Sequence, residues 1–358
     1  MQLIENIKKD LFNKKYANPI ESKNIILSKE TRKNSNNSDL IAFLNVKENE
    51  IIEKIIEPNL KQLDDNYIIV TDNFKKYQKQ IDFMKEQGYS IKFLDPISEN
   101  SSYYNPLLFL DLYKIKSDFY YDVFNISYPY IENQCKKQNI QKNELQLHFE
   151  KYMEFIIEYF KKDNLELTFK NILKFLDKKD VDLKKISENI IEEKYLNPII
   201  GLISIFAFIK NINQNNENLF LEAINKKTIF FIKYTETYNN LKCIMTLFFK
   251  HLYLYIKSIQ NNFHIQIYFD QINIFNINER FLDYINRITW QTKNINVILI
   301  NNTEMIRTKE IFFTANIAIM MNNSNNEMSY INKTMNNNEC LIIDNHDPDI
   351  CFSTQKYF

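Results

Sequence analysis

The chain has 358 residues and equal numbers of basic and acidic side chains, 45 of each, so its formal net charge is zero. This balance provides no overall field that would favour nucleic acid or an acidic membrane surface. Glycine is the anomaly: the chain has only 2, Gly88 and Gly201, where an average composition would give roughly 25. Two distant glycines exclude G-x-G-x-x-G and G-x-x-x-x-G-K-[ST], and with them the usual glycine-rich phosphate loops.

Reactive side chains form no independent catalytic or metal site. The four cysteines contain no C-x-x-C pair, the four histidines have no metal-ligand spacing, and no serine lies in a nucleophile elbow, so we expect no metal and no cofactor. The longest apolar run, Ile199 to Ile209, is about half the roughly 20 residues of a membrane helix, so we expect no membrane span. Trp290 has core-like spacing, and we interpret it as a core residue rather than a base-stacking platform.

The first third of the chain alternates between strand and helix patterns. Short apolar runs at 39–44, 66–71 and 90–94 predict strands, and apolar residues at helical spacing over 47–57 and 74–84 predict the helices between them. Gly88 stands where a helix C-cap favours left-handed backbone. Strands that alternate with helices in this way imply a parallel sheet.

After Asn105-Pro106 the pattern is helical to about residue 215, and two apolar helix faces, at 149–160 and 169–176, could pack on each other without the sheet. Strand patterns then return at 228–234, 265–270, 296–300 and 317–321, with helices at 241–256 and 280–288 and short strand candidates at 340–343 and 349–352. We therefore predict an α/β domain of residues 1–106 plus 216–358, interrupted by an all-α insertion at 107–215.

Two carboxylates follow predicted strands. They would lie at the carboxyl edge of a parallel sheet, where α/β proteins bind ligands. Asp72 follows the strand at 66–71 and could equally cap the next helix. Asp270 follows IQIYF, the pattern with which a Walker B strand presents its magnesium ligand. The next residue is Gln271, whose side chain cannot act as a general base.

Several short strings resemble the cytoplasmic ATPase domain of the type IV coupling proteins of the TraG/TraD kind, which feed DNA or proteins into conjugation and secretion channels. EPNL (57–60) resembles the family's K-P-N-L, and VTDNFKKY (70–77) resembles its V-T-D-P-K-G-E-L. GYSIKFLDP (88–96) resembles G-Y-x-V-x-x-L-N-P, and SSYYNPL (101–107) resembles S-x-x-Y-N-P-L. IQIYFDQINIF (265–275) resembles V-x-F-L-L-D-E-F-A-N-I. NVILINN resembles the sensor strand and puts Asn301 at its glutamine position. The resemblance implies a RecA-like, P-loop NTPase-type α/β fold with a mostly parallel sheet.

The departures from this family concern its ATP site. Counted back from EPNL, the Walker A motif places Val46 and Glu50 at the glycines, Ile51 at the lysine and Ile52 at the magnesium-binding hydroxyl. β-Branched residues cannot form the nest of backbone N–H groups that holds phosphate, and glutamate would repel it. The Walker B glutamate is replaced by Gln271. The resemblance therefore implies degenerate Walker motifs, with Asp270 as their remaining carboxylate and no catalytic or cofactor-binding residue.

These replacements predict a pseudo-ATPase that acts as a substrate- or partner-binding subunit in conjugative DNA transfer or type IV secretion. In the family the helical insertion recognises the substrate, so we expect 107–215 to be the working surface. Two alternatives stay open: a motor subunit whose ATP site is completed by an active coupling ATPase paralogue, and a non-functional remnant of a mobile element. We expect protein subunits of the apparatus as partners, with DNA open but not indicated by charge, and a cytoplasmic location from which partners could bring the chain to the inner face of the membrane.

Overall fold

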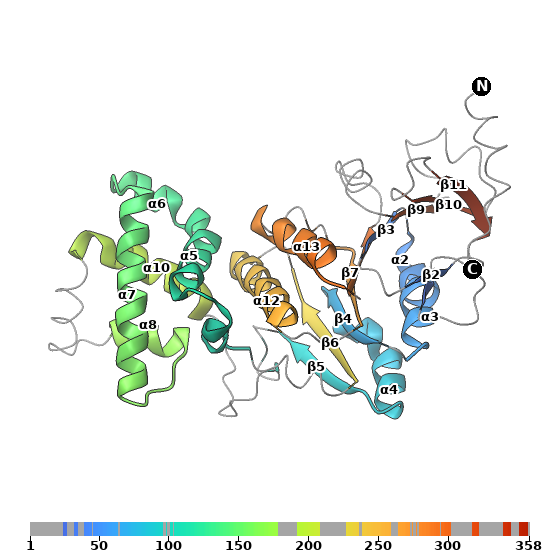
Figure 1. The fold of residues 1–358 in the computed structure, drawn as a ribbon, viewed down its shortest axis with the longest axis horizontal. Coiled ribbons are helices and arrows are strands. Elements are labelled where there is room, and N and C mark those ends of the chain that lie inside the picture. The colour runs from blue at the N-terminus through green and yellow to red at the C-terminus, as the bar shows by residue number, and fades with distance from the viewer. Residues whose placement is uncertain are drawn as a thin grey trace, which may run out of the picture.

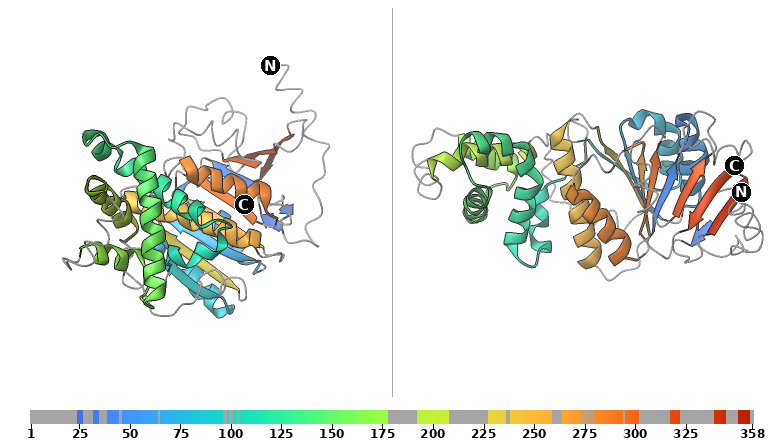
Figure 2. Two further views of the ribbon diagram at one scale, coloured as in Figure 1. Left: turned by 60° about the vertical axis from the view of Figure 1, so that its left-hand side comes forward. Right: turned by 90° about the horizontal axis from the view of Figure 1, so that it is seen from above.

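The computed structural model describes residues 24–26, 32–34, 39–44, 46–63, 65–95, 98, 101–102, 104–177, 192–207, 227–235, 238–258, 264–272, 274, 277, 279–293, 295–301, 317–321, 339–344 and 351–356. A central sheet is covered by helices on both faces, and a further helical unit is stacked beyond one of these helix layers (Figures 1 and 2). The molecule is therefore an α/β unit extended on one side by helices.

The main sheet has the strand order β11-β10-β9-β3-β8-β7-β4-β6-β5. Its strands are β3 (Leu40–Leu44), β4 (Asn66–Thr71), β5 (Ser90–Leu94), β6 (Thr228–Lys233), β7 (Ile265–Asp270), β8 (Ile295–Asn301), β9 (Ile317–Met321), β10 (Glu339–Asp344) and β11 (Cys351–Lys356). The strands from β9 to β5 pair in parallel, and β10 and β11 extend the sheet in antiparallel fashion. The predicted mostly parallel RecA-like sheet is confirmed.

The strand predictions differ from the structure at the two ends of the chain. β11 runs from Cys351 to Lys356 rather than over 349–352. The CFSTQK sequence of β11 is too polar to be recognised alone, and its pairing with β10 defines it. At the other end, β1 (Asn24–Ile26) and β2 (Arg32–Asn34) form an antiparallel pair that the sequence did not predict.

Both faces of β3, β4, β6 and β7 are buried, and successive residues alternate between two cores, whereas β5 at the edge of the sheet is only partly buried. On β3, for example, Leu40, Ala42 and Leu44 belong to one cluster, whereas Ile41 and Phe43 belong to the other. Such continuous apolar strands are typical of a sheet covered on both faces. The helices that follow β3 and β4 cover the second cluster: α2 (Glu48–Glu50), η1 (Ile51–Ile56), α3 (Glu57–Leu60), η2 (Phe74–Tyr77) and α4 (Gln78–Glu86). Gly88 follows α4 with φ of +81°, as its C-cap position predicts.

The first cluster is covered by α12 (Asn239–Ser258) and α13 (Glu279–Gln291). Beyond them lies the helical unit (Figure 1), formed by η3 (Pro106–Leu112), α5 (Lys116–Ser127), η4 (Tyr128–Tyr130), α6 (Glu132–Lys137), α7 (Lys142–Lys162), α8 (Phe169–Asp177) and α10 (Glu193–Ala207). Every described element between Pro106 and Ala207 is helical, as the sequence predicts.

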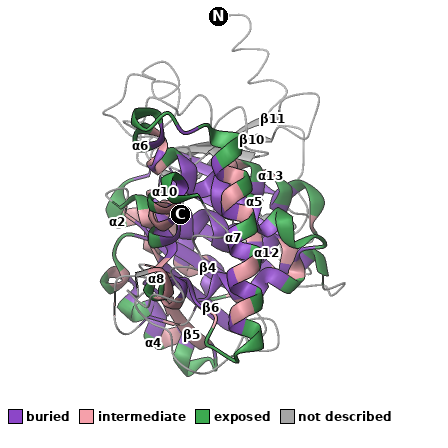
Figure 3. Cartoon of the chain, turned by 90° about the vertical axis from the view of Figure 1, so that its left-hand side faces the viewer, coloured by how far each residue is buried: buried purple, intermediate pink, exposed green. Residues whose placement is uncertain are grey.

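Helix α12 is the shared layer between the sheet and the helical unit. It packs against η3, α5 and α10 on one side, and the core cluster that contains it runs without a break from the helical unit to the sheet. Buried residues occur in every turn of α12, and Figure 3, which looks onto the helical unit, shows buried residues (purple) through the middle of the molecule. The division into 1–106 plus 216–358 and 107–215 stays a prediction, and the shared core argues against independent folding of the insertion.

Among the described helices, none combines the length and the apolar character that crossing a membrane would require.

Candidate functional site

The strand register brings the predicted site positions to one edge of the sheet. Leu44 at the end of β3 pairs with Asn301, Asp270 at the end of β7 pairs with Ile300, and Thr71 at the end of β4 pairs with Lys233. The positions that resemble Walker A follow β3 at this same carboxyl edge. The side chain of Asn301 lies outside the described part of the structure.

Asp270 is the buried centre of this edge, and its side chain has no solvent exposure. Its Oδ2 atom accepts hydrogen bonds from the Tyr77 hydroxyl at 2.6 Å and the Thr71 hydroxyl at 3.2 Å. The Lys76 ammonium lies 2.6 Å from the same oxygen. We call Asp270, Lys76, Tyr77, Thr71 and Asp72 the edge site. Asp270 is therefore already paired within the chain.

Tyr77 remains a hydrogen-bond donor to this carboxylate at neutral pH. Burial, and after it the negative charge of Asp270, raises the pKa of the Tyr77 phenol well above its ordinary value. Because a phenolate would face the carboxylate without a proton between them, the neutral form is strongly favoured. The short contact to Asp270 is thus a charge-assisted hydrogen bond.

A local turn places Lys76 and Tyr77 against Asp270. Asn73 begins η2, and its Oδ1 atom accepts the backbone N–H of Lys75 at 3.0 Å. Sequence reasoning missed Lys76. The signal was nevertheless present, because in VTDNFKKY a lysine stands where V-T-D-P-K-G-E-L has glutamate, which reverses the charge at that position.

The other strand-end residues have modest roles. Asp72 does not cap the next helix, a role that Asn73 takes; it is 70% exposed and lies 3.6 Å from the Lys76 ammonium. Gln271 adopts left-handed backbone with φ of +56°, and its N–H donates to the carbonyl of Ile300. Its Nε2 atom is buried without a hydrogen-bond partner in the structure. The structure thus brings Asp270, Gln271 and Asp72 to one edge of the sheet, where protein groups enclose Asp270 and Asp72 faces solvent.

A helical turn takes the place of a phosphate-binding loop after β3. The helix begins at Glu48, and the N–H groups of Glu50 and Ile51 already donate to the carbonyls of Lys47 and Glu48. Acidic residues occupy the first turn, where they complement the positive end of the helix. These two backbone donors are therefore engaged within the helix, beside negative charge.

The side chains at the lysine and hydroxyl positions have packing roles. Ile51 is 1% exposed in the core between helix and sheet, Ile52 packs against that core, and Glu50 pairs with Lys54 at 2.9 Å. Val46 is fully buried. The assignment of Val46 to the first glycine is one residue late, because the motif has four residues between its glycines; counted from Glu50, that position is Asn45, which lies outside the described residues.

The string with the strongest resemblance, SSYYNPL, joins the sheet to the helical unit. The Tyr104 hydroxyl lies 2.9 Å from Nδ1 of His251 on α12, and the Asn105 amide donates to the carbonyl of Leu167 at 2.7 Å. Pro106 stands in the first turn of η3. His251 is fully buried and stacks on Phe109, so its interpretation as a structural residue is supported.

A second buried carboxylate links α5 to α12 and α13. Asp122 lies 3.3 Å from the Lys250 ammonium and 3.6 Å from the Arg280 guanidinium, and it accepts the Tyr284 hydroxyl at 3.2 Å. We call Asp122, Lys250, Arg280 and Tyr284 the junction cluster. No local pattern in the sequence predicts this cluster, because its members come from three separate helices.

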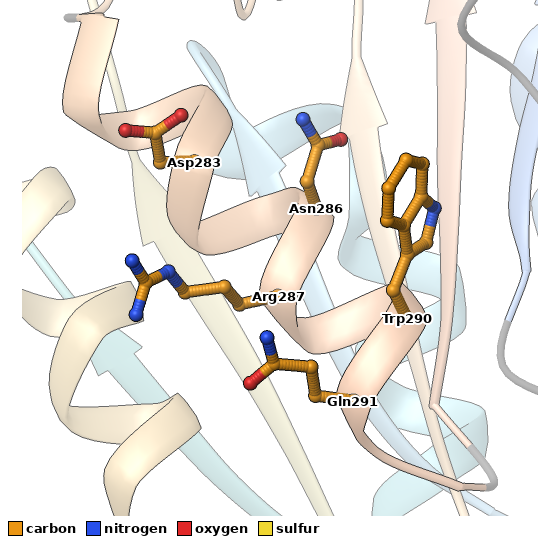
Figure 4. Close-up of a pocket in the computed structure, with 5 residues that line it drawn as sticks. All are labelled: Asp283, Asn286, Arg287, Trp290 and Gln291. Carbon is orange, nitrogen blue, oxygen red and sulfur yellow. The ribbon is translucent and has the colours of Figure 1, made fainter.

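A shallow pocket of about 230 Å³ lies along the outer face of α13, lined by Asp283, Asn286, Arg287, Trp290 and Gln291 (Figure 4). Trp290 is 76% exposed, so its interpretation as a core residue was wrong. Its neighbours Ile285 and Ile288 face the core instead, and a one-letter pattern does not distinguish a tryptophan at the edge of an apolar helix face from one within it.

Among the described residues, no group of three or more His, Cys, Asp or Glu is arranged to hold a metal ion.

Comparisons with known proteins agree on the fold. VirB4 of Thermoanaerobacter pseudethanolicus matches with a TM-score of 0.58 and 12% identity, over 96% of this chain and 98% of that one. The bacterial conjugative coupling protein TrwB matches with a TM-score of 0.58 and 8% identity over 99% and 91%, and TrwB bound to the GTP analogue GDPNP with 0.57 and 7% over 99% and 92%. No family model and no curated protein sequence matches. At these identities the likeness establishes a shared RecA-like fold.

Proposed function

We propose that this chain is a non-hydrolysing relative of the conjugative coupling proteins and of VirB4, acting as a substrate- or partner-binding subunit in conjugative DNA transfer or type IV secretion. The fold shared with VirB4 and TrwB over nearly the whole chain supports a place in such an apparatus. The observation that carries the loss of hydrolysis is the helix that starts at Glu48, where the Walker A resemblance requires a phosphate loop.

Four features disfavour ATP at the edge of the sheet. The N–H groups of Glu50 and Ile51 are bonded within a helix, and the residue at the lysine position, Ile51, is part of the core. Asp270 is engaged by Lys76, and no carboxylate follows it to orient an attacking water. A phosphate site needs free backbone donors and positive charge. On this edge the N–H groups of Glu50 and Ile51 are engaged in the helix, and the Lys76 ammonium is paired with Asp270.

The helical unit is the proposed working surface. None of the altered Walker positions lies in it, and the junction cluster and α12 hold it against the sheet. Because the chain has no net charge, we propose a protein partner rather than bare DNA, whose binding would weaken by orders of magnitude between about 50 and 200 mM salt. We propose a cytoplasmic location, with contact to the inner face of the membrane through partners.

The test combines the full chain with an active coupling ATPase from the same genome. Complex formation is followed by size-exclusion chromatography, and ATP hydrolysis is measured with the parent chain, with Asp270→Asn and with Asp72→Asn as the matched exposed control. A binding subunit predicts a complex whose hydrolysis rate is the same for all three chains. A rate that falls only with Asp270→Asn would favour the composite motor, and no complex at any salt concentration would favour a non-functional remnant.

A further inference from the structure

The edge site contains a buried negative charge, the carboxylate of Asp270, that needs a positive partner. Asp270 lies at a strand end where the fold would lead one to expect a divalent metal ion. Its side chain is fully buried, its Oδ2 atom already receives three donors, and its Oδ1 atom is buried with no hydrogen-bond partner among the described residues. Magnesium keeps several of its waters when it binds protein. A carboxylate without solvent exposure leaves no room for that hydration shell, so the edge site does not fit the ion.

Lys76 has the geometry that a bridging cation would have. Its ammonium lies 2.6 Å from Asp270 and 3.6 Å from Asp72, so one positive charge is shared by two carboxylates. The Lys76 side chain is 22% exposed, whereas Asp72 is 70% exposed. The partly exposed lysine therefore lies between the buried carboxylate of Asp270 and the exposed carboxylate of Asp72.

We propose that Lys76 is the resident cation of the edge site, which holds the carboxylate edge of the sheet in a single, charge-balanced state that requires neither a divalent metal ion nor nucleotide. This inference deepens the proposed function and rests on it: a subunit that does not cycle through nucleotide states gains a fixed edge where an active relative would have an exchangeable ion. The lysine is tethered to the chain, so the balance holds at any metal concentration.

The experiment measures midpoint temperatures of the full chain with and without about 10 mM MgCl₂ or MnCl₂, in the absence of nucleotide. The variants are Lys76→Ala, Lys76→Gln, Lys76→Ala/Asp270→Asn, and Lys75→Ala as the control at an exposed neighbouring lysine. We expect the parent and Lys75→Ala to be insensitive to the ions. Without metal, Lys76→Ala should melt roughly 5–10 °C lower, because it leaves a buried charge without a partner.

Two results together support the resident cation. Divalent ions should raise the midpoint of Lys76→Ala by about 2–4 °C, and Asp270→Asn in the same chain should restore stability while abolishing the metal response. If Lys76→Ala does not fold, Lys76→Gln keeps a donor without the charge and should show the same pattern with a smaller loss.

The inference is overturned if the parent itself responds to the ions through Asp270, or if neither Lys76 variant gains stability from metal or from Asp270→Asn. These outcomes are separate from the proposed function, because nucleotide binding and partner binding are measured on the unaltered chain. A parent that binds ATP would contradict the proposed function whatever the Lys76 variants do.

Discussion

The edge site and the junction cluster are built from the same kinds of residue and differ in what they connect. Each has a buried aspartate, a lysine and a tyrosine that donates to the carboxylate. In the edge site Asp270 is paired with Lys76, which comes from the turn after the neighbouring strand. In the junction cluster Asp122 on α5 is paired with Lys250 on α12 and Arg280 on α13. The edge site pairs charges at the carboxyl edge of the sheet, and the junction cluster connects α5 of the helical unit to α12 and α13, which cover the sheet.

The two sites differ in how their buried aspartate is paired and in how much of the fold that pairing requires. At the edge one cation from a local turn is paired with the buried carboxylate at the end of β7. At the junction two cations from distant helices converge on one carboxylate, an arrangement that requires the whole tertiary fold. Burial, and after it the charge of Asp122, raises the pKa of Tyr284 well above its ordinary value, so the phenol stays a donor there as well. Buried charge in this protein thus serves to hold surfaces in place.

The junction should be the more sensitive of the two regions. Asp122→Asn would leave Lys250 and Arg280 facing a neutral amide in a largely buried space. Removing one partner of a buried ion pair costs about 3–5 kcal/mol, and urea unfolding of the full chain would measure the loss. The control is Asp118→Asn, an exposed position one turn earlier on α5, for which we expect less than about 1 kcal/mol. Equal losses at both positions would mean that the junction behaves like a surface pair.

The edge site should tolerate the loss of one donor better than the junction tolerates the loss of its carboxylate. Tyr77→Phe removes the hydroxyl that donates to Asp270 and leaves the ring in place. A hydrogen bond to a charged group contributes about 1.5–3 kcal/mol, so we expect a loss in that range by urea unfolding. Tyr238→Phe at a 47% exposed tyrosine is the control, with an expected change within about 0.5 kcal/mol. A Tyr77→Phe change as small as the control would indicate that solvent reaches Asp270.

The free energy of unfolding should decrease as pH falls, because His251 is buried as a neutral ring where α12 packs against the helical unit. Burial, and after it the charge of Lys250, lowers the pKa of His251 well below its ordinary value in the folded state. Below about pH 6.5 the unfolded chain therefore binds a proton that the folded chain does not, and stability falls as pH decreases, by up to about 1.36 kcal/mol per pH unit.

The measurement is the free energy of unfolding at several pH values between about 7 and 5, where the slope from His251 should develop. His251→Phe/Tyr104→Phe should remove this contribution to the slope, whereas Tyr104→Phe alone keeps the histidine and should keep the slope. Identical slopes in the parent and the double variant would show that His251 takes up its proton in the folded state.

The smallest effect on stability is expected at the outer face of α13, which belongs to neither buried site. Trp290→Ala should change the free energy of unfolding by no more than about 0.5 kcal/mol, because the ring is largely in solvent. As the only tryptophan in the chain, Trp290 also reports directly on this face: its fluorescence should resemble that of indole in water and be quenched readily by iodide. Emission typical of a buried indole would show that another part of the chain covers it.

The sequence was sufficient for the fold because parallel strands leave a strong local signal. Runs such as NYIIVT and IQIYF are mostly apolar, since both faces of β4 and β7 are buried, and the intervening helices have apolar residues at regular spacing. β1, β2 and β11 were missed or displaced, because strands of three residues and polar strands are defined by their pairing rather than by their own residues.

The candidate site was only partly predictable. Asp270 and Gln271 could be placed at a strand end from local pattern alone, and the altered Walker A positions from resemblance. The partners of Asp270 could not, because Lys76 and Tyr77 come from a turn almost 200 residues away in sequence, and only the register of β4 against β7 brings them together. The junction cluster has the same character, with α5, α12 and α13 far apart along the chain.

The central claim is that the edge of the sheet no longer forms a nucleotide site, and isothermal titration calorimetry of the full chain with ATP and Mg²⁺ tests it most directly. TrwB, solved with a GTP analogue bound, would be the positive control under the same conditions. We expect no binding heat above dilution at protein concentrations well above micromolar, since the N–H groups of Glu50 and Ile51 are engaged in a helix and Asp270 is engaged by Lys76. A saturable heat with micromolar affinity, lost in Asp270→Asn, would contradict the account.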